Sequence, residues 1–144
     1  MKWLIFFITL FGFSKYSIKP EQITASNFCF VESLRMSNLL KSICNSVLFH
    51  RLDGIICSNT SIDHHDMNGE GGLSGTPLKK LATDKLLFIK SIVKNEIPLI
   101  ASGGVMTIND FEEKINSGAD LVQVYTGFIF NGPQLIQDLV NLRI

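Results

Sequence analysis

The sequence has no excess of either charge and no cysteine pattern that would hold a metal. Among its 144 residues, 13 are Lys or Arg and 13 are Asp or Glu, so the formal net charge is zero, and no block of basic residues occurs. Nucleic-acid-binding proteins carry a basic patch, and we therefore expect no nucleic-acid partner. Cys29, Cys44 and Cys57 are odd in number and form no Cys-x-x-Cys pair, which favours reduced, buried thiols over a disulfide framework or a zinc site.

The chain is too short for a complete barrel, and its first apolar run is too short for a membrane-spanning helix. A complete (β/α)8 barrel takes roughly 250 residues, so a chain of 144 residues holds at most part of one. The apolar run from Trp3 to Phe13 is shorter than the about 20 residues of a membrane-spanning helix. This run fits a signal-like segment, an interfacial membrane anchor, a strand or a non-native extension. Because residues 14–35 show no sustained period, we treat residues 1–38 as a divergent apolar N-terminal segment and residues 39–144 as the interpretable unit.

From residue 37 onward, predicted helices alternate with predicted strands. Ser37 is suited to cap a helix whose apolar residues recur at near-helical spacing through Leu48. The strands expected after it are Ile55–Ile56, Ile97–Ala101 and Leu121–Tyr125. Each is followed by a predicted helix: the first helix is Pro77–Lys94, the second is capped by Thr107, and the third is opened by Gly132 and Pro133. Three consecutive strand–helix units with short connections predict an α/β fold with a parallel sheet and right-handed crossovers.

Turns rich in glycine and small residues follow the predicted strands. The run from Gly71 to Leu78 opens a helix, Gly103-Gly104 comes directly after an apolar strand, and Tyr125-Thr126-Gly127 repeats that arrangement one unit later. Glycine allows the backbone to approach a ligand closely, and neighbouring loops at the C-terminal ends of barrel strands often bind phosphate. A single Gly-Gly pair is more often only a tight turn, but two such loops in consecutive units favour a phosphate site.

Four motifs in the second part of the chain resemble those of a known family. They are Asp53-Gly54 with Ser58-Asn59-Thr60, the run from Gly71 to Leu78, Gly103-Gly104, and Leu121 to Phe128 with Gly132-Pro133. In this order and spacing they resemble the dihydroorotate dehydrogenases, flavoproteins of pyrimidine biosynthesis built on a (β/α)8 barrel. The Pro77-Leu78 pair is more similar to the quinone-linked, membrane-associated class than to the soluble ones. The resemblance covers approximately Leu39 to the end of the chain and implies a partial TIM barrel made of its last three βα units.

The resemblance implies roles for eight residues. The positions that would contact FMN are Ser58, Gly75, Gly103, Gly104, Tyr125 and Thr126, the last four around its phosphate, where backbone N–H groups and a hydroxyl neutralise negative charge. Asn59 and Thr60 would bind the planar ring of dihydroorotate or orotate, because an amide and a hydroxyl match its donors and acceptors. The resemblance also implies quinone as electron acceptor and a location at the bacterial or mitochondrial inner membrane.

The resemblance does not extend to a catalytic base. In the family a serine removes a proton from the substrate while the flavin takes a hydride. The N-terminal part of the barrel supplies that serine, a lysine that contacts the flavin, and the early FMN loop. Residues 1–38 contain no matching motif, nor a recognisable form of the strand that precedes the helix at Leu39. We therefore assign no catalytic residue. Two readings follow: dihydroorotate oxidation through FMN when the missing half is supplied, or a truncated, non-catalytic fragment with residual phosphate or flavin binding.

Two adjacent histidines invite a metal interpretation that the surrounding sequence does not support. His64 and His65 lie between Asp63 and Asp66 in a polar loop. No further ligand stands at a supporting spacing. We therefore expect no metal site.

Overall fold

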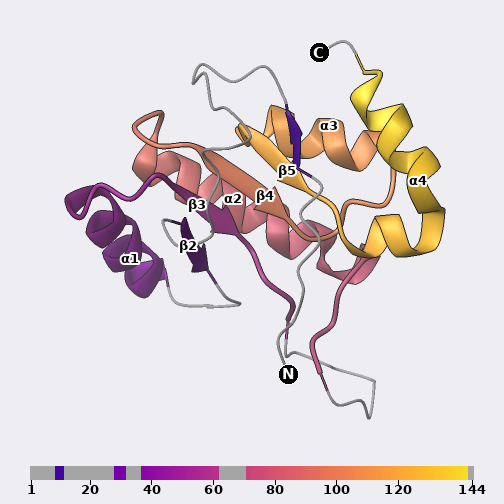
Figure 1. Ribbon diagram of the computed structural model, residues 1–144. Coiled ribbons are helices and arrows are strands. Elements are labelled where there is room, and N and C mark those ends of the chain that lie inside the picture. Colours follow the sequence, from indigo (N-terminus) through magenta and orange to yellow (C-terminus); the bar gives the residue numbers. More distant parts are fainter. Residues whose placement is uncertain (1–8, 12–27, 32–36, 62–70, 143–144) are drawn as a thin grey trace.

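Figure 1 shows the computed structural model, which describes residues 9–11, 28–31, 37–61 and 71–142. A five-stranded sheet runs through the centre in the order β1-β5-β4-β3-β2. Its strands are β1 (Thr9–Phe11), β2 (Phe28–Val31), β3 (Gly54–Cys57), β4 (Leu99–Ser102) and β5 (Leu121–Gln123). Strands β2 to β5 are mutually parallel, whereas β1 pairs with β5 antiparallel.

Helices alternate with the parallel strands, as the sequence predicts. They are α1 (Ser37–Phe49), α2 (Lys79–Val93), preceded by the short 3-10 helix η3 (Thr76–Leu78), α3 (Ile108–Asn116) and α4 (Thr126–Val140). The three predicted strand–helix units are thereby confirmed. Crossover helices are what allow neighbouring strands of this sheet to run parallel.

One hydrophobic core lies between the sheet and the helices. Alternate strand residues such as Ile55, Leu99 and Val122 face it and are fully buried, together with Leu86 and Ile89 of α2. The opposite face of the strands carries a separate buried cluster of Ile56, Ile100 and Leu121. Because side chains alternate along a strand, this two-sided burial accounts for the nearly continuous apolar runs in the sequence.

The ends of α3 follow directly from its sequence. Thr107 caps the helix: its hydroxyl accepts a hydrogen bond from the Asp110 N–H at 3.3 Å, and the Asp110 carboxylate accepts one from the Thr107 N–H at 2.9 Å. This reciprocal pair satisfies donors that the helix itself leaves free. After the helix, Gly118 has a φ of +98°, and Asp120 then joins the next strand to β4 through the Leu99 N–H at 2.9 Å.

Two short strands lie in the N-terminal segment, one of them in the apolar run for which a strand was among the alternatives. We found no recognisable strand before the helix at Leu39 in the sequence, and this was wrong. The strand β2 lies there and pairs in parallel with β3, with Phe28 opposite Gly54. The strand β1 extends the sheet at its other edge, with Leu10 opposite Val122. Strands of three or four residues are too short to display a period of 2, and their pairing with distant segments defines them.

α4 consists of two helical pieces. Gly132 is non-helical, with φ 68° and ψ −165°, and separates them, so the second piece opens at Gly132 and Pro133 as predicted. The first piece, from Thr126, was not predicted. Tyr125, at its N-cap, offers no side-chain cap, so the usual start signal is missing from the sequence.

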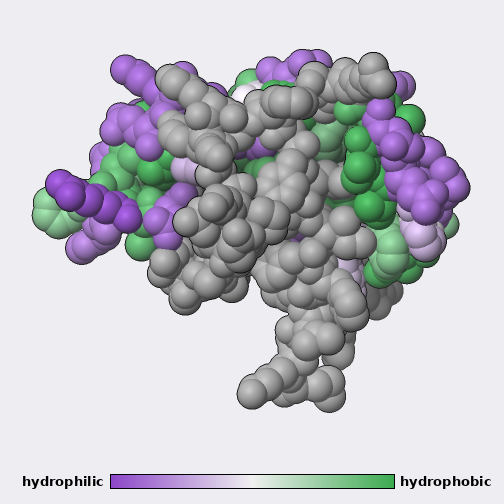
Figure 2. Space-filling view, turned by 45° about the horizontal axis from the view of Figure 1, so that its top comes forward, coloured by the Kyte–Doolittle hydropathy of each residue, from purple (hydrophilic) through white to green (hydrophobic). Residues whose placement is uncertain are grey.

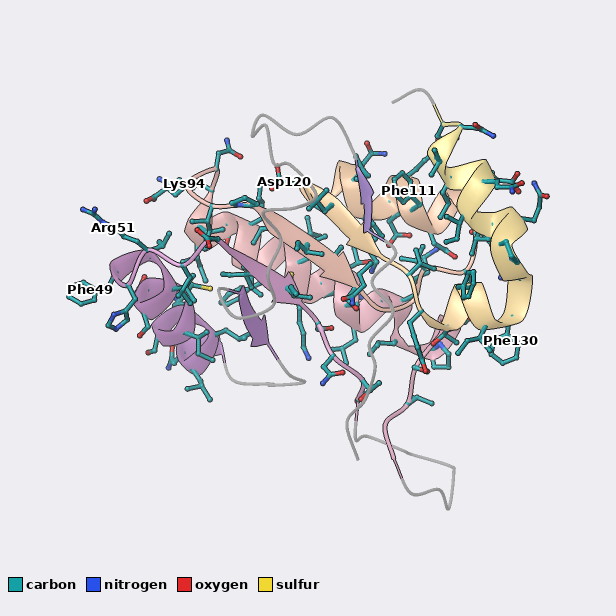
Figure 3. The ribbon with its side chains drawn as sticks, in the orientation of Figure 1. Phe49, Arg51, Lys94, Phe111, Asp120 and Phe130 are labelled. Carbon is teal, nitrogen blue, oxygen red and sulfur yellow. The ribbon has the colours of Figure 1, made fainter. Side chains whose placement is uncertain are left out.

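Figure 3 shows the contrast between the inner and outer helical surfaces through two labelled side chains. Phe111 of α3 is 1 % exposed, whereas Phe130 of α4 is 76 % exposed. In the part of the chain that is described, no helix is both long enough and apolar enough to cross a membrane. The predicted signal or anchor run at residues 3–13 lies outside the described residues except for Thr9–Phe11.

Candidate functional site

The predicted binding loops lie at one edge of the parallel sheet. Ser58 follows β3, Gly103 follows β4, and Tyr125 stands just beyond β5 as the N-cap of α4. The Ser58 N–H donates to the Ser102 carbonyl at 3.0 Å, which joins the ends of β3 and β4. In α/β folds ligands bind at the carboxyl ends of the strands, so this edge is the candidate site.

The glycine-rich run meets the start of α4. The Thr126 hydroxyl donates to the Ser74 hydroxyl at 3.0 Å, across 52 positions of sequence. A Cβ atom on Gly75 would stand 3.1 Å from Cγ2 of Thr126, and Gly75 has a φ of +75°. Both restrictions favour glycine at position 75. The structure therefore brings together Gly75 and Thr126, two of the predicted FMN positions.

The Gly103-Gly104 turn packs directly on the start of α2. Both residues have positive φ values, +102° and +76°. A Cβ on Gly103 would stand 2.7 Å from Cδ2 of Leu78, and one on Gly104 would collide with the backbone of Lys79. The first-turn N–H groups of α4 are unpaired by helix geometry. Such a set of free N–H donors suits a phosphate.

Ser58 provides a buried polar atom without a partner. Its side chain is 3 % exposed, and its Oγ has no hydrogen-bond partner among the described residues. A buried hydroxyl costs free energy unless it is hydrogen-bonded. The orphan hydroxyl, the glycine turns and the free N–H groups together fit a polar, phosphate-bearing cofactor such as FMN.

The two predicted substrate residues lie in a different local setting. Asn59 and Thr60 are exposed, and the Asn59 side-chain oxygen accepts a hydrogen bond from the Thr60 N–H at 2.8 Å. Thr60 packs against Gly72, where an added Cβ would overlap its side chain. The structure thus pairs Thr60 with the beginning of the glycine-rich run and Gly75 with α4. Tyr125 is 57 % exposed.

Sequence reasoning missed a polar network behind the Gly103-Gly104 turn. Lys79 Nζ lies 2.6 Å from Asp110 Oδ1 and 3.0 Å from Glu113 Oε2. These hydrogen bonds raise the pKa of Lys79 above its ordinary value. Burial opposes ionisation of Asp110, but bonds from Lys79 and from backbone N–H groups hold its pKa below the usual range. Hydrogen bonds from Lys79 and Thr83 likewise lower the pKa of Glu113. The one sequence signal was the capping pair of Thr107 and Asp110.

The metal expectation concerned residues outside the described part of the chain. His64, His65 and their flanking aspartates fall in residues 62–70, which the structure does not describe. In the segments that are described, no group of three His, Cys, Asp or Glu side chains is placed to hold a metal ion.

Comparisons with known proteins agree with the motifs. The profile of the family described as dihydroorotate dehydrogenase matches residues 36–142. The dihydroorotate dehydrogenase (quinone) of Pseudoalteromonas translucida is 39 % identical over 108 residues, which are 71 % of this chain and 32 % of that protein. The corresponding protein of Psychromonas ingrahamii is 42 % identical over 106 residues, 69 % of this chain and 32 % of that protein.

Solved structures give the same relationship. The crystal structure of the Eimeria tenella enzyme in complex with ferulenol superposes with a TM-score of 0.72 and 30 % sequence identity, covering 78 % of this chain and 32 % of that one. The ligand-free enzyme from the same organism also superposes with a TM-score of 0.72. The chain spans about a third of the length of the curated relatives it matches. It therefore belongs to the quinone-type dihydroorotate dehydrogenase family, of which it represents a part.

Proposed function

We propose that this chain forms the flavin-phosphate part of an FMN-dependent dihydroorotate dehydrogenase. The observation that carries the proposal is the meeting of three glycine-containing turns at one sheet edge, with Thr126 beside Gly75 and Gly104 against Lys79. Ser58, Gly75, Gly103, Gly104, Tyr125 and Thr126 would hold the cofactor. FMN, when bound, supplies hydride acceptance from dihydroorotate and electron transfer to a quinone.

The rest of the active site belongs, in this proposal, to the missing part of a (β/α)8 barrel. Strands β2 to β5 would be its last strands, and residues Asn59 and Thr60 would bind dihydroorotate. A longer native chain or a partner would supply the base and the lysine at the flavin. Membrane association is also part of the proposal, and Figure 2 shows hydrophobic surface at the right of the molecule, in the region of α4. A cavity of about 520 Å³ lies there, lined by Phe128, Pro133, Ile136, Gln137, Val140 and Asn141.

A flavin titration tests the cofactor proposal. FMN and riboflavin share the ring system and differ by the phosphate, so a phosphate site requires tighter binding of FMN, measured by quenching of flavin fluorescence. Gly75→Ala should abolish the preference because its Cβ meets Thr126. Gly71→Ala is the matched control, since Gly71 lies in the same run with a φ of +109°, and no atom of the described residues lies within 4 Å of its Cβ position. Equal affinity of the unchanged chain for both flavins would refute the proposal.

The second candidate function is a non-catalytic partial barrel, and one observation favours it. In a (β/α)8 barrel all strands are parallel, but here β1 occupies the outer edge of β5 in antiparallel orientation. A further parallel strand could pair with β5 only after β1 leaves. The chain would then be a self-capped fragment with residual phosphate or flavin binding.

Complementation separates the two candidates. The segment upstream of the matched region, taken from the Pseudoalteromonas translucida relative, is co-expressed with the intact chain and with a variant lacking residues 1–13. Dihydroorotate-dependent reduction of a quinone is then measured. Activity with either form supports the enzyme, and activity that requires the deletion identifies β1 as a removable cap. Absence of activity with both forms favours the non-catalytic fragment.

A further inference from the structure

Lys79 lies between the Gly103-Gly104 turn and helix α3. Its backbone N and Cα stand where a Cβ on Gly104 would have to be placed, so the turn rests on this residue without an intervening side chain. Gly103 packs instead against the side chain of Leu78, whose Cδ2 would stand 2.7 Å from an added Cβ. Any displacement of the start of α2 is therefore transmitted to the turn, because closely packed atoms leave no room to absorb it.

The Lys79 side chain links this turn to α3. Its Nζ binds Asp110 and Glu113, and the other oxygen of the Asp110 carboxylate accepts the N–H groups of Met106 at 3.0 Å and Thr107 at 2.9 Å. Asp110 thus holds the far end of the segment that begins at Gly103, while Lys79 holds its beginning. Both charges of the Lys79–Asp110 pair are satisfied within the network, and the Asp110 side chain is 9 % exposed.

A buried amine fixes the main chain of Lys79 from the other side. Lys114 is fully buried, and its Nζ donates to the Lys79 carbonyl at 3.1 Å and to the Thr83 hydroxyl at 2.6 Å. Thr83 in turn donates to Glu113 at 2.9 Å. Charge-assisted hydrogen bonds of this kind are roughly twice as strong as neutral ones. Lys79 is consequently held at its side chain and at its carbonyl.

We propose that Lys79 and Asp110 are positioning residues for the phosphate-binding turn, setting the direction of the Gly103 and Gly104 N–H groups without contacting the phosphate. The proposal rests on the proposed flavin-phosphate function for its ligand. It differs from a direct role of Lys79 as a phosphate-binding cation, because two carboxylates already engage its Nζ. The surface pair of Lys80 and Asp84, one residue along the same helix at 2.6 Å, lacks any link to the turn and serves as control.

Amide hydrogen exchange tests the positioning role without any ligand. Lys79→Met and Asp110→Asn should speed exchange of the Met106 and Thr107 amides, which donate to the Asp110 carboxylate, about tenfold, because each variant removes a hydrogen bond to a charged group. Lys79→Arg, which keeps the charge, should restore slow exchange, and Lys80→Met should leave it unchanged. Unchanged exchange in both test variants would overturn the proposal. Faster exchange spread evenly over α2 and β4 would also overturn it, since that is loss of global stability.

Flavin binding by the full chain supplies the second readout. Lys79→Met and Asp110→Asn should weaken FMN binding about tenfold and leave riboflavin binding unchanged, because only FMN reaches the turn with a phosphate. A parallel loss of both flavins, or retention of full FMN preference, would contradict a positioning role. If the unchanged chain does not distinguish the two flavins, the flavin-phosphate function fails, and the exchange data alone decide whether the pair positions the turn.

Discussion

Replacing Gly104 with alanine should destabilise the molecule more than the same replacement at Gly132, although both glycines have positive φ values of similar size. Their φ values are +76° and +68°. A Cβ atom at Gly132 meets no atom of the described chain within 4 Å, whereas one at Gly104 would collide with the Lys79 backbone. The pair therefore separates the cost of the backbone angle from the cost of the contact.

The expected magnitudes follow from these two contributions. Placing a residue with a Cβ at such a positive φ costs about 1–3 kcal/mol, and both variants lose an amount of this size. The contact at Gly104 adds about 1–3 kcal/mol, because it involves main-chain atoms that cannot rotate away and the surrounding structure must shift. Gly104→Ala should thus reduce the free energy of unfolding by about 2–6 kcal/mol and Gly132→Ala by about 1–3 kcal/mol.

Urea unfolding followed by far-UV circular dichroism measures both values. The comparison is valid where the two variants keep the same dependence of unfolding free energy on urea concentration. Equal destabilisation of the two variants would refute the reasoning, because it would mean that Gly104 does not rest on the Lys79 backbone.

Three further predictions concern buried polar groups and a helix cap. Burial, with a further contribution from Cys44, raises the pKa of Cys57 from 9.0 to about 12. Iodoacetamide should therefore modify this thiol only after unfolding. The free energy of unfolding should fall as the pH rises from 9.0 towards about 12, since the folded state binds more protons than the unfolded state in this range. Lys85 is buried with no hydrogen-bond partner for its Nζ among the described residues, and burial lowers its pKa. Lys85→Met should therefore raise the unfolding free energy by about 1 kcal/mol and remove the rise of stability with pH that the lysine causes just below pH 10.5. A destabilised variant would contradict this expectation. Thr107→Ala should cost about 1 kcal/mol by removing the N-cap of α3, and Thr107→Ser should cost less, both measured by urea unfolding.

The parts of the fold that could be predicted are those with a local signal. The helix from Lys79 to Val93 buries Leu86 and Ile89, which recur at helical spacing, and Thr107 marks the next helix through its capping chemistry. The glycines of the candidate site were also recognisable, because a position that needs a positive φ or a close approach leaves few alternatives.

The parts that could not be predicted depend on distant partners. Strand β1 is defined by antiparallel pairing with β5, more than a hundred residues later in the sequence, and three residues alone do not specify that pairing. In the site, Lys114 reaches the Lys79 carbonyl across 35 positions. A lysine in a helical pattern reads as solvent-exposed, so its burial at position 114 becomes visible only once α2 and α3 are packed together.

In the proposed function, Gly103, Gly104 and Thr126 bind the phosphate of FMN. Two-dimensional nitrogen–proton NMR of the full chain, titrated with FMN and separately with riboflavin, measures this binding residue by residue. The amide signals of these three residues should shift with FMN and not with riboflavin, while that of Gly132 should stay in place with both. Shifts confined to other parts of the chain, or equal shifts with the two flavins, would contradict it.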